Sequence, residues 1–186
     1  MKYILDARQS RFTVQAFAAG ALSTFAHNPN FAARDFKGEM SFSSETFEDA
    51  SLLVTVRAAS LELTDTVKEA DRKEILRTMQ EQVLQTAQHP EITYRGTAFV
   101  STRIADNWFR IKIHGNLSLR HIDKPQEIDA QLRLLDGGAR LSGEMALSQA
   151  AYGIKPVTAL AGMIKLKDAL KLAFDFTWTI ENQPPT

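Results

Sequence analysis

The sequence has no cysteine, and its 22 lysines and arginines are balanced by 22 aspartates and glutamates. The absence of cysteine excludes a disulfide framework and thiolate chemistry. The zero net charge gives no electrostatic footprint for nucleic acid or for a membrane surface. No stretch approaches the roughly 20 consecutive apolar residues that a membrane-spanning helix needs. We therefore expect no nucleic-acid partner and no stable membrane insertion.

Signatures of catalytic and metal sites are also missing. The histidines lack a helical two-histidine spacing, no serine lies in a nucleophile elbow, and no glycine cluster resembles a phosphate-binding loop. The sequence therefore predicts no metal, no cofactor and no catalytic residue. The four histidines are His27, His89, His114 and His121.

The length of 186 residues is enough for one domain with its own core and short for two. We expect a single domain over residues 1–181 and a polar tail over residues 182–186. Residues 1–6 lead directly into a strand-like pattern, without the apolar core of a signal peptide. This pattern indicates a cytoplasmic protein, with the trimmed, periplasmic form of an exported protein as the alternative.

The clearest positive feature is strict alternation of apolar and polar residues over residues 108–134. After a connector at residues 120–125 the alternation resumes, which predicts a long antiparallel hairpin with one dry face. The apolar residues are Phe109, Ile111, Ile113, Leu117 and Leu119 before the connector, and Ile128, Ala130, Leu132 and Leu134 after it.

Similar alternation predicts the rest of an all-β fold. The resulting eight or nine antiparallel strands leave two architectures, a closed barrel or a sandwich. Residues 18–30 are interpreted as a loop or short helix that closes one end. The further strands are expected at residues 3–6 and 11–17, which form one interrupted strand, and at residues 31–42, 51–57, 92–100, 140–148 and 169–180.

One segment has a helical period instead. Apolar residues recur at nearly every fourth position between Ala70 and Leu84, and Asp71 with Glu74 resembles a capping box in which Asp71 supplies the capping oxygen. We expect one main α-helix from about Asp71 to Thr86. Pro90 prevents its continuation.

Four strands carry a glycine on the apolar phase, at Gly38, Gly96, Gly115 and Gly143. Such glycines let barrel strands bend sharply. They also remove side chains from the interior, and a barrel of about eight strands either fills its interior or holds one small ligand. The two explanations are compatible and both remain open here; an apolar cavity without charge would select an apolar guest.

The hairpin also carries a family resemblance. Residues 114–125, HGNLSLRHIDKP, resemble the signature G-x-L-(T/S)-(I/L)-R-G-(V/I)-(T/D)-K-P of the YceI-like family of lipid-binding proteins. Ser60 with Thr64, residues 89–94 and residues 152–154 follow in the family's order, so the resemblance spans nearly the whole chain. His121 departs from it, because the family pattern has glycine there.

The resemblance implies an antiparallel lipocalin-like barrel of about eight strands that binds a polyisoprenoid chain or an isoprenoid quinone, for transport, storage or stress protection. It also implies a homodimer as a candidate assembly. At about 0.8 kcal/mol per buried methylene, a guest of tens of carbons would nominally exceed the roughly 20 kcal/mol ceiling of noncovalent binding. Burial of such a guest must therefore be loose or partial.

Candidate ligand-binding residues are the large or inward-phase residues of the predicted barrel and its closing loops. His27 and Arg72 are candidates for contact with a polar head group, while a hydrogen-bonded loop and local helix-start pairing are their structural alternatives. The candidate lining residues are Phe12, Val14, Phe25, Phe36, Gly38, Met40, Tyr94, Phe109, Ile111, Ile113, Gly115, Met145, Met163, Phe174 and Phe176.

Two other functions are compatible with the same fold. A lipid-modifying enzyme, such as a cyclase, isomerase or hydrolase, would use His27 or His121 as acid or base. It would need an inward polar group, whereas the alternation places nearly all polar groups outward. An interaction module would instead expose an apolar patch of more than a few hundred Å².

Overall fold

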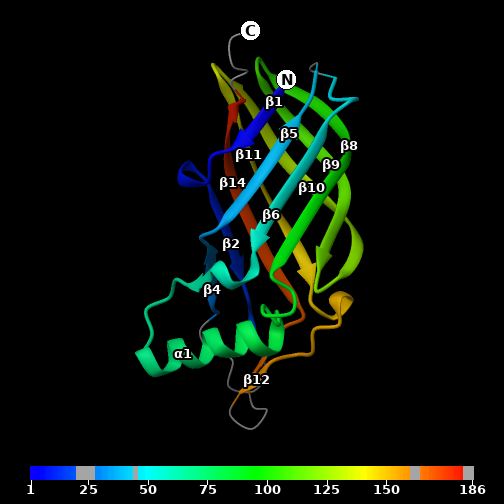
Figure 1. Cartoon of the computed structure of the whole chain (residues 1–186). Helices are drawn as coiled ribbons and strands as arrows, with labels where there is room; N and C mark the ends of the chain where they lie inside the picture. The colour runs from blue at the N-terminus through cyan, green and yellow to red at the C-terminus, as the bar shows by residue number, and fades with distance from the viewer. Residues whose placement is uncertain (20–27, 44–45, 160–163, 182–186) are drawn as a thin grey trace.

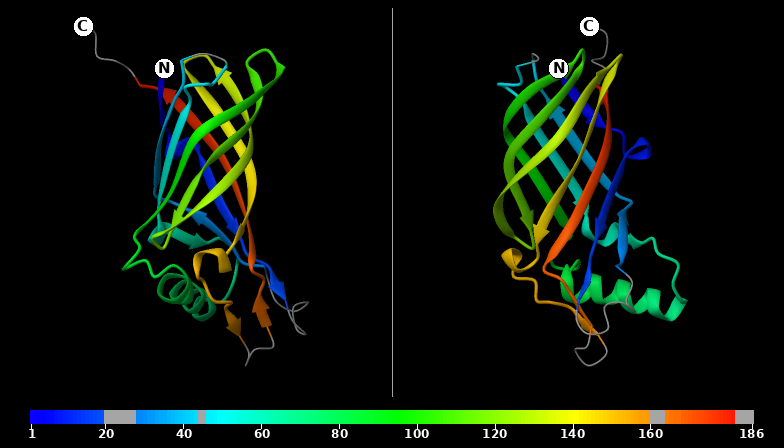
Figure 2. Two further views of the ribbon diagram at one scale, coloured as in Figure 1. Left: turned by 90° about the vertical axis from the view of Figure 1, so that its right-hand side faces the viewer. Right: turned by 180° about the vertical axis from the view of Figure 1, so that it is seen from behind.

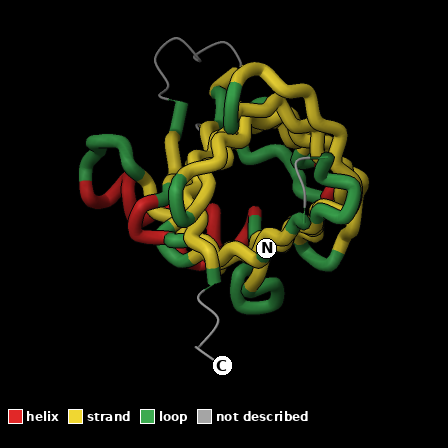
Figure 3. Tube along the Cα trace, turned by 90° about the horizontal axis from the view of Figure 1, so that it is seen from above, coloured by secondary structure: helices red, strands yellow, loops and turns green. Residues whose placement is uncertain are grey.

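The computed structural model describes residues 1–19, 28–43, 46–159 and 164–181. Its long antiparallel strands close into a barrel, because β1 pairs with both β5 and β14, and Figure 3 shows the closed ring from above. The predicted all-β barrel is confirmed and the sandwich alternative is wrong. In order around the barrel the strands are β1 (Lys2–Leu5), β5 (Phe36–Ser41), β6 (Ser51–Arg57), β8 (Glu91–Ala105), β9 (Trp108–Leu119), β10 (Ile122–Leu135), β11 (Gly138–Ser148) and β14 (Ala169–Ile180).

Three short strands extend the wall at one end of the barrel. After the 3-10 turn Ala7–Gln9, β2 (Arg11–Gln15) continues the line of β1 along β14, which confirms the predicted interrupted strand. β4 (Asn30–Ala33) pairs with β2, and β7 (Leu61–Leu63) pairs with β4. We call this end of the barrel the lower end and the end that carries Met1 the upper end (Figure 1).

A second, small sheet lies below the lower end (Figure 2). It consists of β12 (Thr158–Ala159), β13 (Ile164–Leu166) and β3 (Ala18–Ala19), paired antiparallel in that order. The loop or short helix predicted for residues 18–30 therefore begins as a strand, and residues 20–27 lie outside the described part of the chain. A 3-10 turn, Ala150–Tyr152, follows β11.

The predicted hairpin is formed by β9 and β10, with Phe109 opposite Leu132 and Ile113 opposite Ile128. The apolar phase points inward, as Ile113 is 0% exposed. The connector is shorter than predicted: only Arg120 and His121 form the turn, both with positive φ, which is typical of tight hairpins.

The predicted connector also contained Pro125, which instead lies within β10 and pairs with Asn116. This part of β10 has β9 on one side only, because β11 joins β10 from Asp129 onward. A strand with a free edge tolerates proline, since the missing N–H group need not take part in a ladder.

The helix α1 (Glu69–Thr78) crosses the lower end and continues as a π-helical turn over Met79–Val83. The predicted helix is present, but the capping box is wrong: Lys68 is the N-cap residue and makes no side-chain cap hydrogen bond. Asp71 lies in the first turn, where a carboxylate favours the positive end of the helix dipole. The helical stretch ends before Thr86, because Gln85 adopts a positive φ of 51°.

Gly115 makes room for an aromatic ring and for neighbouring backbone. A Cβ atom there would lie 2.3 Å from the carbonyl oxygen of Arg95 and 2.7 Å from the hydroxyl of Tyr94. The Tyr94 ring passes from β8 over Gly115, and its hydroxyl donates a hydrogen bond to the carbonyl of Gln126 on β10, at 3.0 Å. The space that Gly115 frees is therefore occupied, and the proposal that this glycine empties a cavity is wrong.

We expect Gly115→Ala to lower the free energy of unfolding by about 1–3 kcal/mol, the usual cost of overpacking, because backbone cannot move away as a flexible side chain can. Urea unfolding measures the loss. Asn116→Ala is the matched control, since Asn116 is exposed on the same strand, and should change stability by less than about 0.5 kcal/mol. A Gly115→Ala protein as stable as the unsubstituted chain would contradict this explanation.

Candidate ligand-binding site

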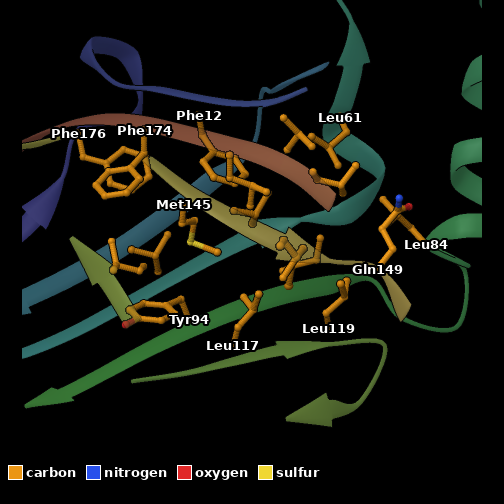
Figure 4. A pocket seen from close by; sticks show the side chains of 18 of the residues that line it. Phe12, Leu61, Leu84, Tyr94, Leu117, Leu119, Met145, Gln149, Phe174 and Phe176 are labelled. Atoms are coloured by element: carbon orange, nitrogen blue, oxygen red, sulfur yellow. The ribbon is translucent and has the colours of Figure 1, made fainter. Parts of the chain in front are cut away.

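An apolar chamber of about 120 Å³ lies inside the barrel (Figure 4). Apart from Gln149, every described residue that lines it is aliphatic, aromatic or methionine. The aromatic part of the lining comes from Phe12 on β2, Tyr94 on β8, and Phe174 and Phe176 on β14. We call this space the inner chamber.

A larger outer chamber of about 930 Å³ lies between the lower end of the barrel and the α1 segment. It adjoins the inner chamber at a ring of residues that line both spaces, which we call the neck. The outer chamber also carries charged residues, from α1, from the segment after β7, from the β9–β10 turn and from the segment before β12. The neck consists of Val14, Leu61, Val83, Leu84, Gln149 and Leu170.

The charged residues of the outer chamber are largely engaged within the fold. Asp65 accepts hydrogen bonds from the backbone and side-chain nitrogens of Asn30 at 2.6 and 3.0 Å. Arg120 donates to Gln85 at 3.0 Å, and Glu74 pairs with Arg77, whose hydrogen bonds lower the Glu74 pKa. These hydrogen bonds and the ion pair therefore stabilise the border of the outer chamber.

The inner chamber includes part of the predicted lining set. The structure places seven of the candidates around it: Phe12, Val14, Tyr94, Ile113, Met145, Phe174 and Phe176. Their assignment as ligand contacts stays a prediction. Phe25, Met163 and the head-group candidate His27 lie outside the described residues.

The remaining predicted lining residues belong to the wall or to the upper half of the barrel and line neither chamber. A stack of rings fills the upper interior: Tyr3 on Phe42 at 4.9 Å, Phe42 on Phe47 at 5.0 Å and Phe47 on Phe109 at 5.2 Å between centroids. We call these four residues the aromatic plug. The predicted lining residues that line neither chamber are Phe36, Gly38, Met40, Phe109, Ile111 and Gly115.

Arg72 also lines neither chamber, although the two residues that it bonds, Leu63 and Asp65, line the outer one. Its two terminal nitrogens donate to the carbonyls of Leu63 and Asp65 at 2.6 and 2.7 Å. The guanidinium thus fastens α1 to the end of β7. This placement matches the alternative of local structural pairing and gives no support to a head-group contact.

His121 packs edge-on against His89, with ring centroids 4.6 Å apart, and neither ring lines a chamber. Burial, with the nearby His121 and Arg120, lowers the pKa of His89. The enzyme alternative placed His121 at the ligand, and the structure places it outside both chambers. Among the described residues, no group of three or more histidine, aspartate or glutamate side chains is arranged to hold a metal ion, and no helix is long and apolar enough to cross a membrane.

The sequence reasoning missed Gln149, which is the only residue other than Tyr94 that brings a polar side-chain group to the described lining of the inner chamber. It is 6% exposed, and its Nε2 donates to the carbonyls of Lys167 and Asp168 at 3.0 and 3.3 Å. The Asp168 carboxylate fixes the same turn by accepting from Ser148 and from the backbone of Ala150, each at 2.6 Å; the Ser148 hydrogen bond lowers the Asp168 pKa. No alternation marks Gln149, because it lies where β11 ends.

Comparison with known proteins agrees with this architecture. A family model described as the YceI-like domain matches residues 3–178. The chain belongs to the YceI-like family. This confirms the resemblance carried by residues 114–125, despite His121 in place of glycine. A comparison with curated proteins gave no significant match.

Several solved structures share the fold at low identity. BcnA of Burkholderia cenocepacia has a TM-score of 0.70 and 12% identity, covering 93% of this chain and 98% of that one. A polyisoprenoid binding domain from Saccharophagus degradans, implicated in plant cell wall breakdown, has a TM-score of 0.69 and 11% identity, covering 95% and 97%. A YceI protein of Campylobacter jejuni has a TM-score of 0.58 and 15% identity, covering 81% and 84%.

Tyr94 gives a pH-dependent test of the barrel wall. Its hydroxyl faces the carbonyls of Gln126 and Ile113 at 3.0 and 3.3 Å, and burial raises its pKa. Because the unfolded tyrosine ionises near pH 10 while the folded one stays protonated, its contribution to stability is complete below about pH 10 and falls as the pH rises further.

We expect Tyr94→Phe to cost about 1 kcal/mol near neutral pH and to lose less stability than the unsubstituted protein between about pH 9 and pH 11. Urea unfolding near neutral pH measures the first effect, and urea unfolding at about pH 9 and pH 11 measures the second. Tyr3→Phe is the control near neutral pH and should cost less there, because the only hydrogen bond of the Tyr3 hydroxyl to a described residue is a weak one to the Met1 sulfur, at 3.9 Å. An unchanged alkaline loss in Tyr94→Phe would refute the assignment.

Proposed function

We propose that this protein is a noncatalytic carrier that buries an apolar lipid, a polyisoprenoid or isoprenoid quinone, in the two adjoining chambers for transport, storage or protection under stress. The observation that carries the proposal is the uncharged inner chamber, which adjoins a larger outer chamber at a neck that is aliphatic except for Gln149. The inner chamber offers burial and no charged side chain that would select a polar guest. The Saccharophagus domain, named for polyisoprenoid binding, supports the choice of chain type.

The chamber sizes set how a chain fits. A cavity of about 150 Å³ holds one benzene molecule, so the inner chamber, at about 120 Å³, has room for roughly one isoprene unit. The outer chamber, at about 930 Å³, is within the usual range of roughly 300–1,000 Å³ for ligand sites. A chain of tens of carbons would extend beyond both, which agrees with partial burial.

The described lining gives no observation that favours an enzyme. Tyr94 is the only titratable group among the described residues that line the inner chamber, and its hydroxyl faces carbonyls of the wall. The cytoplasmic location and the homodimer remain predictions from the sequence.

Binding can be measured with the chain's own tryptophans. The protein has two, and Trp178 is buried with its ring 6.2 Å from that of Phe176, which lines the inner chamber. In a Trp108→Phe protein, Trp178 is the sole reporter. We expect a short-chain prenyl quinone to quench it with saturation. Absence of saturable quenching would contradict the proposed function.

Filling the neck should weaken this binding. Val14 lines both chambers, so Val14→Phe places a ring where about two carbons of the guest would lie. At about 0.8 kcal/mol per methylene, the loss corresponds to roughly tenfold weaker affinity. The assay is quinone quenching in the Trp108→Phe background.

Thr13→Phe is the matched control, because Thr13 is the exposed neighbour on the same strand. It should leave the affinity within about twofold of the parent, because a twofold change corresponds to less free energy than one hydrogen bond contributes. Urea unfolding checks that both variants fold. Equal affinities for the two variants would place the guest outside the neck.

A further inference from the structure

Apart from tyrosine and tryptophan, Gln149 is the only buried polar side chain among the described residues, and it lies in the neck between the two chambers. Figure 4 shows it beside Leu84 at the end of the inner chamber. The other members of the neck are aliphatic. Any ligand that occupies both chambers therefore passes this one amide.

The hydrogen bonds fix which atom of the amide is free. Both partners of Nε2 are carbonyl oxygens, of Lys167 and Asp168, and a carbonyl only accepts. The amide nitrogen must face them, so the Nε2 and Oε1 atoms of Gln149 cannot exchange places without losing both bonds. Oε1 receives no hydrogen bond from any described residue, although an amide oxygen can accept two.

The turn around Gln149 holds this orientation firmly. Its backbone N–H donates to Asp168 at 3.1 Å, and its carbonyl accepts from the N–H groups of Tyr152 and Ile154 at 3.0 and 3.1 Å. With main chain and side chain both held, Oε1 is a preorganised acceptor, which loses little freedom when a donor arrives.

Resting on the proposed function, we infer that Gln149 Oε1 accepts a hydrogen bond from a hydroxyl group of the bound lipid. The neck then selects an isoprenoid alcohol over a guest that carries only acceptors at that point, such as an ether or a quinone. A site built to pair a ligand hydroxyl rejects the analogue that lacks it, because a guest in the neck removes water from the acceptor and leaves it unpaired. Gln149 is thus a specificity-determining residue for the polar group of the guest.

The test compares two probes that differ in one hydrogen-bond donor: geranylgeraniol and its methyl ether. Each displaces the prenyl quinone from Trp108→Phe protein, and recovery of Trp178 fluorescence gives its affinity. One neutral hydrogen bond predicts that the alcohol binds about three- to tenfold more tightly than the ether. Equal affinities in this protein, which needs no change at Gln149, would overturn the inference.

Gln149→Met, which keeps the side-chain length and removes the acceptor, should bring the alcohol-to-ether ratio close to one by weakening the alcohol alone. Gln88→Met is the matched control, because Gln88 is exposed and lines neither chamber; the preference should persist there. A preference that survives in folded Gln149→Met protein would also overturn the inference. Failure of the quinone to quench would instead contradict the proposed function, so the two failures are distinguishable.

Discussion

An eight-stranded barrel has an interior that must be filled by side chains or by a guest, and this chain meets that constraint differently at its two ends. At the upper end the aromatic plug of Tyr3, Phe42, Phe47 and Phe109 occupies the interior. Phe47 is 1% exposed and adopts a positive φ of 57°, a conformation uncommon for a bulky residue. The plug restricts the inner chamber to the rest of the barrel.

The lower end stays open because the strands diverge there. β2, β4 and β7 continue one side of the wall below the closed ring, while β8 pairs with β6 and with no described residue of β7. The helical segment covers the space between them, and only its later part, at Met79 and Leu84, is buried. The outer chamber therefore follows from how the barrel widens, and Arg72 holds the covering helix to the wall.

The sequence predicted the faces of the strands well and the position along the barrel axis poorly. Alternation assigns a residue to the inner or outer face, so Ile113 and Phe109 were both expected to meet a ligand. Alternation carries no information on the position of a residue along the barrel axis. Phe109 lies in the aromatic plug, whereas Ile113 lines the inner chamber. The error at Gly115 has a similar origin, because its space is filled by Tyr94, two positions before its strand partner Gly96.

Two further features depended on contacts that no local pattern records. The helix α1 begins at Glu69 without a side-chain cap, and Arg72 attaches it to carbonyls beyond the helix, so a capping-box pattern at Asp71 was misleading. Gln149 is placed by carbonyls of residues 167 and 168, which lie 18 and 19 positions away. Periodicity and turn signals reach only a few residues along the chain, so this residue could not be found from them.

The central claim is that an apolar guest occupies the lower half of the barrel and stops below the aromatic plug. Methyl NMR spectra during titration with a prenyl alcohol test this most directly. The neck residues Leu84 and Leu170 should show large saturable shifts, while Leu132, paired with Phe109 beside the plug, should show little change. Shifts at Leu132 as large as those at Leu84, or shifts confined to exposed methyl groups, would contradict the account.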